Sequence, residues 1–280
     1  MTDLRKHLAG YSVLNKLYEI QSERPPLNKL ASFLGFSPLL EEGRSWHAGL
    51  IGETEVGDIL EPLKSEGYMV LHSVPIGDNG TDIDHIVATP SGIIYTVNTK
   101  HHKGKAIWAA GTSVLISGQK SDHVKKSRAE ASRVRRLLET VDHSKDRHVV
   151  PLLVFVEASK INSKENAVIT ALHSHQLVKY IRDIEKTRLR PNSYLFADAP
   201  EDNNEFLLTS EFWTKSYVDE TGQQEERRVW LKRLTRQVRT QHIKQGVWRL
   251  VGTLVLIALG SGALLIGLPL LFGLLSGVVI

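Results

Sequence analysis

The last part of the chain most constrains what it can fold into, because residues 250–280 form a run of thirty-one residues without a charged side chain. The run is rich in Leu, Val, Ile and Gly. It exceeds the ~18 apolar residues that indicate a transmembrane helix. We therefore predict a C-terminal transmembrane segment over residues 250–280.

The predicted segment is longer than one membrane crossing requires. As a single helix it would extend ~46 Å at ~1.5 Å per residue, against a hydrocarbon core of ~30 Å. We expect a tilted or kinked single span, because each half of a hairpin bent near Gly260 would have only ~15 residues, short of the ~20 needed to cross. A re-entrant segment and a buried core helix are the alternatives.

A basic stretch precedes the charge-free run. Residues 227–249 carry eight Lys or Arg and no acid, and removing these charges from the formal net charge of +4 leaves −4 for the rest of the chain. Apolar side chains recur there at near-helical spacing, at Trp230, Leu234, Val238 and Ile243. The pattern predicts a basic amphipathic helix beside the membrane. By the positive-inside rule, we expect a cell-membrane protein whose soluble part faces the cytoplasm.

Two β-rich runs in the middle of the chain flank a turn. Residues 82–88 and 93–100 are rich in Ile, Val, Thr and Tyr, and Pro90 and Gly92 lie between them. This pattern predicts a β-hairpin.

Polar side chains interrupt both predicted strands. Because side chains alternate along a strand, Asp82 and Asp84 share one face, and Asn98 and Lys100 share a face of the second strand. Folding about the turn brings Asp84 roughly opposite Val97 and Asn98. A carboxylate, an amide and an ammonium then converge, which is a layout that can hold a divalent metal beside a lysine. Taken singly, each residue also fits an ordinary strand end.

The surrounding pattern indicates an α/β domain with a central mixed sheet. A helical pattern runs from Trp46 to about Gly67, with Glu53 near its start, where the helix macrodipole alone would favour a carboxylate. Strands are predicted at 68–74, 148–156 and 167–172, helices at 119–141 and 176–188, a loop at 190–204, and mainly helix in residues 1–45 with a break at Pro25 and Pro26.

The region after the hairpin is basic. Residues 98–136 contain ten Lys or Arg against two acids, and the predicted helix over 119–141 has a basic face. Such faces bind nucleic-acid backbones without regard to sequence, although a solvated helix face is an equal alternative. The candidate contacts are Lys103, Lys105, Gln119, Lys120, Lys125, Lys126, Arg133 and Arg136.

Other chemistries lack support in the sequence. No phosphate-loop motif or spaced Ser/His/Asp set is present, and the absence of cysteine excludes disulfides and thiolate zinc sites. We expect no N-terminal signal from the polar start of the chain. The neighbours His101 and His102 point to opposite faces of a strand, so joint metal chelation is not expected.

An ordered set of residues resembles the NERD, or nuclease-related, domain family. The resemblance covers roughly residues 46–160 and is carried by Trp46, Gly52-Glu53, Asp82-Ile83-Asp84-His85, Pro90-Ser91-Gly92, Asn98-Thr99-Lys100, Gly104 and Gln119. That family is similar to the PD-(D/E)xK nuclease-like fold. The resemblance thus implies a restriction-endonuclease-like core, a mixed sheet flanked by helices.

The resemblance also implies a site. Glu53 would be the first-helix acid, Asp84 the metal-binding aspartate and Lys100 the motif lysine, and together they would be the catalytic residues. Glu53, Asp84 and Asn98 would hold Mg²⁺, with Mn²⁺ as the alternative, for hydrolysis of phosphodiesters. The chain departs from the family pattern at Asn98, which stands where the family usually has an acid and adds no negative charge.

We expect five regions along the chain: an N-terminal helical extension (1–45), a NERD-like domain (46–160), an α/β extension (161–226), the basic helix (227–249) and the transmembrane segment (250–280). Three functions stay open at this point: a membrane-anchored, metal-dependent nuclease, a nucleic-acid-binding module without catalysis, and a membrane-tethered interaction scaffold. DNA and RNA are both possible ligands.

Overall fold

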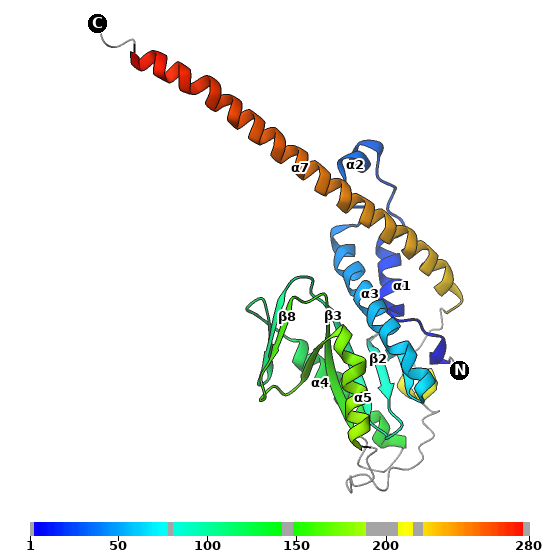
Figure 1. Cartoon of the computed structure of the whole chain (residues 1–280). Helices are drawn as coiled ribbons and strands as arrows, with labels where there is room; N and C mark the ends of the chain where they lie inside the picture. Colours follow the sequence, from blue (N-terminus) through cyan, green and yellow to red (C-terminus); the bar gives the residue numbers. More distant parts are fainter. Residues whose placement is uncertain (1–2, 78–80, 142–147, 189–206, 215–220, 277–280) are drawn as a thin grey trace. The chain divides into compact units, whose positions relative to one another are not determined.

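The computed structural model describes residues 3–77, 81–141, 148–188, 207–214 and 221–276, with side chains for all of these except 141, 221 and 260–276 (Figure 1). The chain forms two compact units. Unit 1 comprises Met1–Ile20 and Glu42–Arg228, and unit 2 comprises Gln21–Glu41 and Val229–Ile280. The predicted NERD-like region lies within unit 1. The loop expected at 190–204 lies outside the described residues.

Unit 1 contains a central five-stranded sheet of mixed direction. Its strand order is β1-β2-β3-β7-β9. The pairs β1–β2 and β2–β3 are antiparallel, whereas β3–β7 and β7–β9 are parallel. The strands are β1 (Met69–Pro75), β2 (Asp82–Ala88), β3 (Ile94–His101), β7 (Val149–Val156) and β9 (Thr170–His173). The mixed sheet predicted from the sequence is confirmed.

Helices flank this sheet. The described residues of unit 1 form the helices η1 (Leu4–Lys6), α1 (Tyr11–Gln21), α3 (Glu41–Leu60), η2 (Glu61–Glu66), α4 (His123–Val141), η3 (Ser174–Gln176), α5 (Leu177–Arg188), α6 (Ser210–Trp213) and η5 (Thr221–Gln223). Of these, α1 and α3 each reach one residue into unit 2. One buried cluster joins the sheet to α4 through Ala131, Val134 and Leu138. Another joins its other face to α3 and α5, through residues such as Val56 and Ile181. Figure 1 shows α4 and α5 on opposite sides of β3.

The β2–β3 hairpin forms as the sequence predicts. Its turn is closed by hydrogen bonds from Thr89 N to the Ile93 carbonyl (2.8 Å) and from Gly92 N to the Thr89 carbonyl (3.0 Å). In the register of the hairpin His85 faces Val97. Asp84 therefore lies level with Asn98, as expected.

A second, four-stranded sheet was not predicted; three of its strands precede β7 in the chain and the fourth follows it. Its order is β6-β5-β4-β8, formed by β4 (Ala106–Ala110), β5 (Ser113–Ile116), β6 (Gln119–Ser121) and β8 (Lys160–Ser163). The helix expected from residue 119 begins only at His123, because Gln119–Ser121 pair with β5. Three glycines with positive φ, Gly104 (69°), Gly111 (50°) and Gly118 (84°), form the turns that such short strands require.

Unit 2 is built on the long helix α7 (Gln224–Ser276), of which it holds all but the first turn, and on the short helix α2 (Lys29–Leu34). Hydrogen bonds from Trp248 Nε1 to the Phe33 carbonyl (2.9 Å) and from Lys244 Nζ to the Ser32 carbonyl (2.8 Å) hold these elements together. Gly35, at φ 81°, lies so close to α7 that an added Cβ would meet Gln245 N at 2.7 Å.

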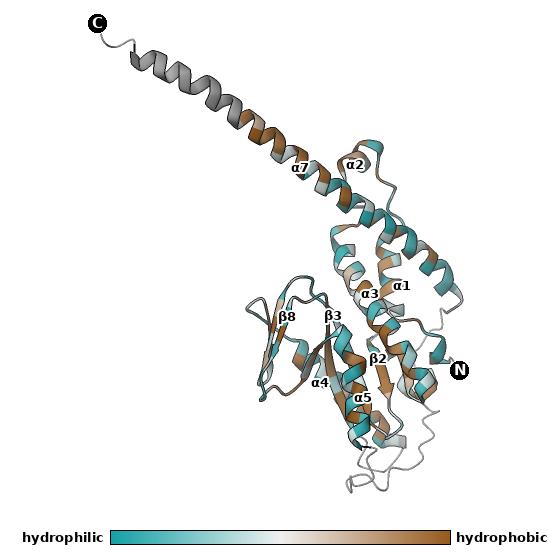
Figure 2. Ribbon diagram, in the orientation of Figure 1, coloured by the Kyte–Doolittle hydropathy of each residue, from teal (hydrophilic) through white to brown (hydrophobic). Residues whose placement is uncertain are grey.

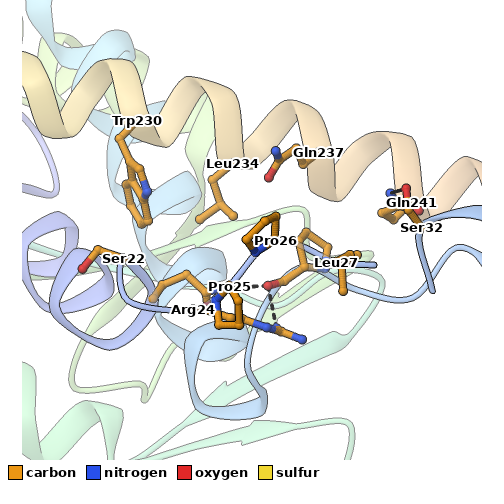
Figure 3. Close-up of a pocket in the computed structure, with 12 residues that line it drawn as sticks. Ser22, Arg24, Pro25, Pro26, Leu27, Ser32, Trp230, Leu234, Gln237 and Gln241 are labelled. Atoms are coloured by element: carbon orange, nitrogen blue, oxygen red, sulfur yellow. Dashed lines mark hydrogen bonds between the residues drawn. The ribbon is translucent and has the colours of Figure 1, made fainter. Parts of the chain in front are cut away.

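A cavity of about 350 Å³ lies within unit 2 (Figure 3). Trp230 and Leu234 of α7 line it together with Pro25 and Pro26, and Arg24 donates to the Pro38 carbonyl at 2.5 Å. None of the candidate site residues lines this cavity.

The helix predicted over 227–249 is part of α7, but the apolar stripe predicted along it is only partly exposed. Leu234 and Val238 are buried, whereas Ile243 is 62% exposed.

Among residues whose side chains are described, no helix is both long and apolar enough to cross a membrane. The predicted span over 250–280 lies largely outside that set, since side chains are described only as far as Leu259. Figure 2 shows apolar residues on the turns of α7 that come just before the grey part of the helix.

Candidate functional site

The strands β2 and β3 separate at the predicted site. Their ladder ends at the pair His85–Val97, whereas β3 stays paired with β7 as far as His101. Beyond the end of the ladder, the backbone amide of Thr99 donates to Asp84 Oδ2 at 2.5 Å. We call this opening, between residues 82–84 of β2 and 98–100 of β3, the strand fork.

The predicted lysine and aspartate meet in the strand fork. Lys100 Nζ lies 4.0 Å from Asp84 Oδ2 and donates to the Thr99 carbonyl at 2.8 Å. The Lys100 side chain is 27% exposed and that of Asp84 13% exposed. The fork is therefore open to solvent from the lysine side.

Helix α3 brings Glu53 to the same place. Gly52 allows this approach, because an added Cβ would lie 3.2 Å from the Cβ of His101 and 3.5 Å from Cγ2 of Thr99. Glu53 is only 7% exposed. Besides burial, the nearby charges of Asp84 and Asp82 raise the pKa of Glu53 and that of Lys100 lowers it, in keeping with a position beside the strand fork.

Three buried acceptor oxygens around the strand fork have no hydrogen-bond partner among the described residues. They are Glu53 Oε2, Asp82 Oδ2 and Asn98 Oδ1. A buried acceptor without a partner is costly, so each calls for a reason. Oxygens of this kind are the ligands that hard divalent cations prefer.

The acids at the strand fork hold their protons more tightly than usual. Burial raises the pKa of Glu53 well above its ordinary range, and the charges of Asp84 and Asp82 raise it further against Lys100. Burial likewise raises the pKa of Asp84, with Lys100 opposing, and raises that of Asp82 to about 6. One lysine does not balance these acids, and a bound cation would.

A preformed metal cage of acids is not present in the described part of the chain. No three His, Asp or Glu side chains there form a group that could hold a metal ion. The predicted set has only two acids, Glu53 and Asp84, and its third member, Asn98, contributes an amide oxygen.

The structure adds Glu130 of α4, which the sequence analysis missed as a site residue. Asn98 Nδ2 donates to Glu130 Oε2 at 2.8 Å. Burial raises the pKa of Glu130 to about 7; the Asn98 hydrogen bond lowers it, and Asp84 raises it. Helical periodicity puts Glu130 on one face with His123 and Ser127 (i, i+4, i+7), but no pattern in the sequence indicates that this face lies against β3.

His102, the residue after β3, contacts His123 at the start of α4. Their Nε2 atoms lie 3.3 Å apart and their rings stack with centroids 5.6 Å apart. Burial lowers the pKa of His123 to about 4 and also lowers the pKa of His102, so both rings are neutral at pH 7. His101 faces elsewhere, with its Nε2 3.3 Å from Glu157 Oε2. The divergence of His101 and His102 agrees with their expected opposite faces.

A basic groove lies between β6 and the first turns of α4. It is a cavity of about 720 Å³ lined by Lys120, Lys125 and Arg128, with hydroxyl groups from Thr112, Ser121 and Ser132 and one acid, Asp122. We call the cavity with its three cations the basic groove. Arg128 was not among the candidate contacts predicted from the sequence.

The remaining candidate contacts lie outside the basic groove. Lys126 is exposed and pairs with Asp122 at 2.8 Å, and Lys103 lies 3.3 Å from Glu157. Gln119 on β6, Lys105 before β4, and Arg133 and Arg136 farther along α4 are exposed. The structure therefore brings together two of the eight predicted contacts, Lys120 and Lys125, and spreads the others over the surface.

Comparison with known proteins identifies one domain. Residues 48–156 match the nuclease-related domain, NERD. The match lies inside the range 46–160 expected from the sequence and contains Glu53, the strand fork and α4. No curated protein and no solved structure matches the chain.

Proposed function

We propose that the NERD domain of this chain binds nucleic acid and hydrolyses its phosphodiester bonds with the aid of a divalent metal. The observation that carries the proposal is the convergence of Glu53, Asp84 and Lys100 at a solvent-accessible opening in the sheet, where buried oxygens have no partner among the residues that the structure describes. A mixed sheet flanked by helices is also the core that the resemblance to the nuclease-like fold implies, and this agreement supports the proposal.

The residues fit a hard cation. Glu53 and Asp84 would hold Mg²⁺ or Mn²⁺ through carboxylate oxygens, and Asn98 would add its amide oxygen. The metal would supply Lewis-acid activation of water and of the phosphoryl group. Lys100, which donates to the Thr99 carbonyl near Asp84, would stabilise negative charge that develops on the phosphate.

Metal-dependent cleavage of labelled DNA and RNA by the full-length chain tests this proposal. Lys100→Ala and Asp84→Asn should each lower the cleavage rate by about 10²–10³-fold, the size of effect typical of a lost electrostatic stabiliser. Asp84→Asn keeps an acceptor for Thr99 N, so the fold should survive. Lys179→Ala on α5 is the matched control. A cleavage rate of Lys100→Ala equal to that of the wild type would disprove the catalytic role of Lys100.

A non-catalytic binding module is the second candidate, and the observation that favours it is Asn98 itself. A neutral amide at this position weakens the attraction for a cation. In that case the wild-type chain should bind nucleic acid without cutting it, and Asn98→Glu should tighten Mn²⁺ binding and create cleavage. Cleavage by the wild-type chain at a rate that Asn98→Glu does not change would exclude this candidate.

We further propose that unit 2 attaches the domain to the cytoplasmic face of a membrane. Leu30, Phe33 and Phe36 are 67%, 58% and 56% exposed, and Ile243 and Val247 of α7 are 62% and 55% exposed. The T-shaped contact of Phe33 with Trp248 (5.0 Å) joins the two segments into what we call the α2–α7 apolar surface. This surface leads into the charge-free run over 250–280, and the basic residues before it favour anionic lipid.

A further inference from the structure

The strand fork lacks one negative charge at position 98, yet an acid stands beside that position. The carboxylate of Glu130 on α4 accepts a hydrogen bond from Asn98 Nδ2 at 2.8 Å. Asn98 is 5% exposed and Glu130 is partly buried, so water competes little for this contact. The neutral amide is thus coupled directly to a carboxylate from a different element.

The hydrogen bond fixes which way the amide points. An ionised carboxylate only accepts, so it must bind the NH₂ group of Asn98 and not its oxygen. Asn98 Oδ1 is then directed away from Glu130, and it is buried without a hydrogen-bond partner among the described residues. An oriented, unsatisfied amide oxygen beside Asp84 is ready to bind a cation.

We propose that Glu130 is a positioning residue for a divalent metal, and that the Asn98–Glu130 pair does the work of the single carboxylate missing from position 98. Glu130 acts through Asn98: it orients the amide oxygen and adds the negative charge that the amide lacks. Interactions of this kind behind a metal ligand change metal affinity by about 10–100-fold. This inference rests on the proposed function, because it assumes the metal of that site.

Mn²⁺ binding to the full-length chain, measured by calorimetry at pH 8, tests the inference without any substrate. Glu130→Gln keeps the shape and the acceptor oxygen for Asn98 Nδ2 but removes the charge. It should weaken Mn²⁺ binding about 10-fold. Glu139→Gln, an exposed position on the same helix, is the matched control and should leave the affinity unchanged.

A reversed pair distinguishes a metal role from a merely structural one. Asn98→Asp combined with Glu130→Gln exchanges the amide and the carboxylate while preserving both the hydrogen bond and the net charge. Mn²⁺ affinity should return to within about twofold of wild type, since the tenfold loss on charge removal is reversed. Weak binding in the reversed pair, with an unchanged melting temperature, would overturn the inference.

Asp84→Asn separates this inference from the proposed function. If Asp84→Asn abolishes Mn²⁺ binding and Glu130→Gln leaves it at the wild-type level, Glu130 has no role and the metal site stands. If wild-type protein binds no Mn²⁺, or Asp84→Asn binds it as wild type does, the metal site itself is wrong and the inference fails with it.

Discussion

At the scale of single residues, two buried histidines on β1 and β2 should make stability sensitive to acid. His72 Nε2 lies 2.7 Å from Glu61 Oε1, and His72 Nδ1 lies 2.8 Å from His85 Nδ1. Burial lowers the pKa of His72, and it lowers that of His85 well below the ordinary value. The folded protein therefore holds both imidazoles neutral.

The sign of the pH effect follows from these lowered pKa values. Because the unfolded chain takes up protons near pH 6.5 and the folded chain does not, stability is fully present above that pH and falls as the pH drops toward the folded pKa values. The raised carboxyl pKa values at the strand fork act in the opposite sense. A comparison between variants is needed to isolate the contribution of the histidines.

The melting temperature should fall between pH 7.5 and pH 5 by less in His85→Leu than in the wild type. The difference should be about 2–4 °C for each kcal/mol that protonation of His85 contributes to unfolding. Calorimetry or circular dichroism melts measure this, with the exposed His242→Leu as control. An identical acid-induced loss in His85→Leu and wild type would contradict the assignment.

Residue by residue, the sequence predicts the strand side of the site and the acid on α3, but not the contribution of α4. Alternation along the hairpin was enough to put Asp84 level with Asn98, because the strand period is two and the turn was recognisable. Glu130 could not be found in this way. Its contact with Asn98 depends on how α4 is rotated against β3, which is a tertiary packing result that no local pattern records.

At the scale of elements, the N-terminal half of α4 should govern nucleic-acid affinity. Lys125→Glu with Arg128→Glu places two negative charges in the basic groove. Binding to labelled duplex DNA should weaken, and the dependence of log K on log salt should become less steep by roughly 1.8, since each lost phosphate contact removes about 0.9. Fluorescence anisotropy over a salt series measures both.

Lys179→Glu with Lys186→Glu on α5 is the matched control, because it makes the same change of charge on the opposite face of the sheet. Equal losses of affinity in the two double variants would indicate a general charge effect and exclude the basic groove as the binding surface.

The elements themselves were predictable to different degrees. The core order of helix, three strands, helix and strand was visible because each element carries a long apolar pattern. The small sheet was not, since β4, β5 and β6 have only three to five residues each and are too short for a periodic signal. Their glycine turns were present in the sequence and were the one available sign.

At the scale of the whole molecule, unit 2 should direct where unit 1 acts. Full-length protein should fractionate with membranes and resist a salt wash, whereas a chain ending before Leu250 should be released by salt. Phe33→Ser with Phe36→Ser should further weaken binding of that truncated chain to anionic vesicles, as flotation measures. Vesicle binding that is unaffected by the two serines would exclude the α2–α7 apolar surface.

A protease-protection experiment on intact cells tests the orientation. A tag at Met1 should be protected, because the basic flank over 227–249 favours the cytoplasmic side. A tag after Ile280 should be accessible from outside for a single span and protected for a re-entrant segment. Digestion of the Met1 tag in sealed cells would refute the proposed localisation.

The hydrogen bond from Thr99 N to Asp84 Oδ2 has an evolutionary consequence. Asp84 terminates the pairing of two strands, so a chain that abandoned catalysis would still be under selection to retain an acceptor there. Conservation of Asp84 among descendants of such a protein would therefore say little about activity. The informative pair is Asn98 and Glu130, whose side chains bind each other and not the backbone. If the two positions vary independently among relatives, selection no longer maintains the chemistry. If they vary together, selection still maintains it.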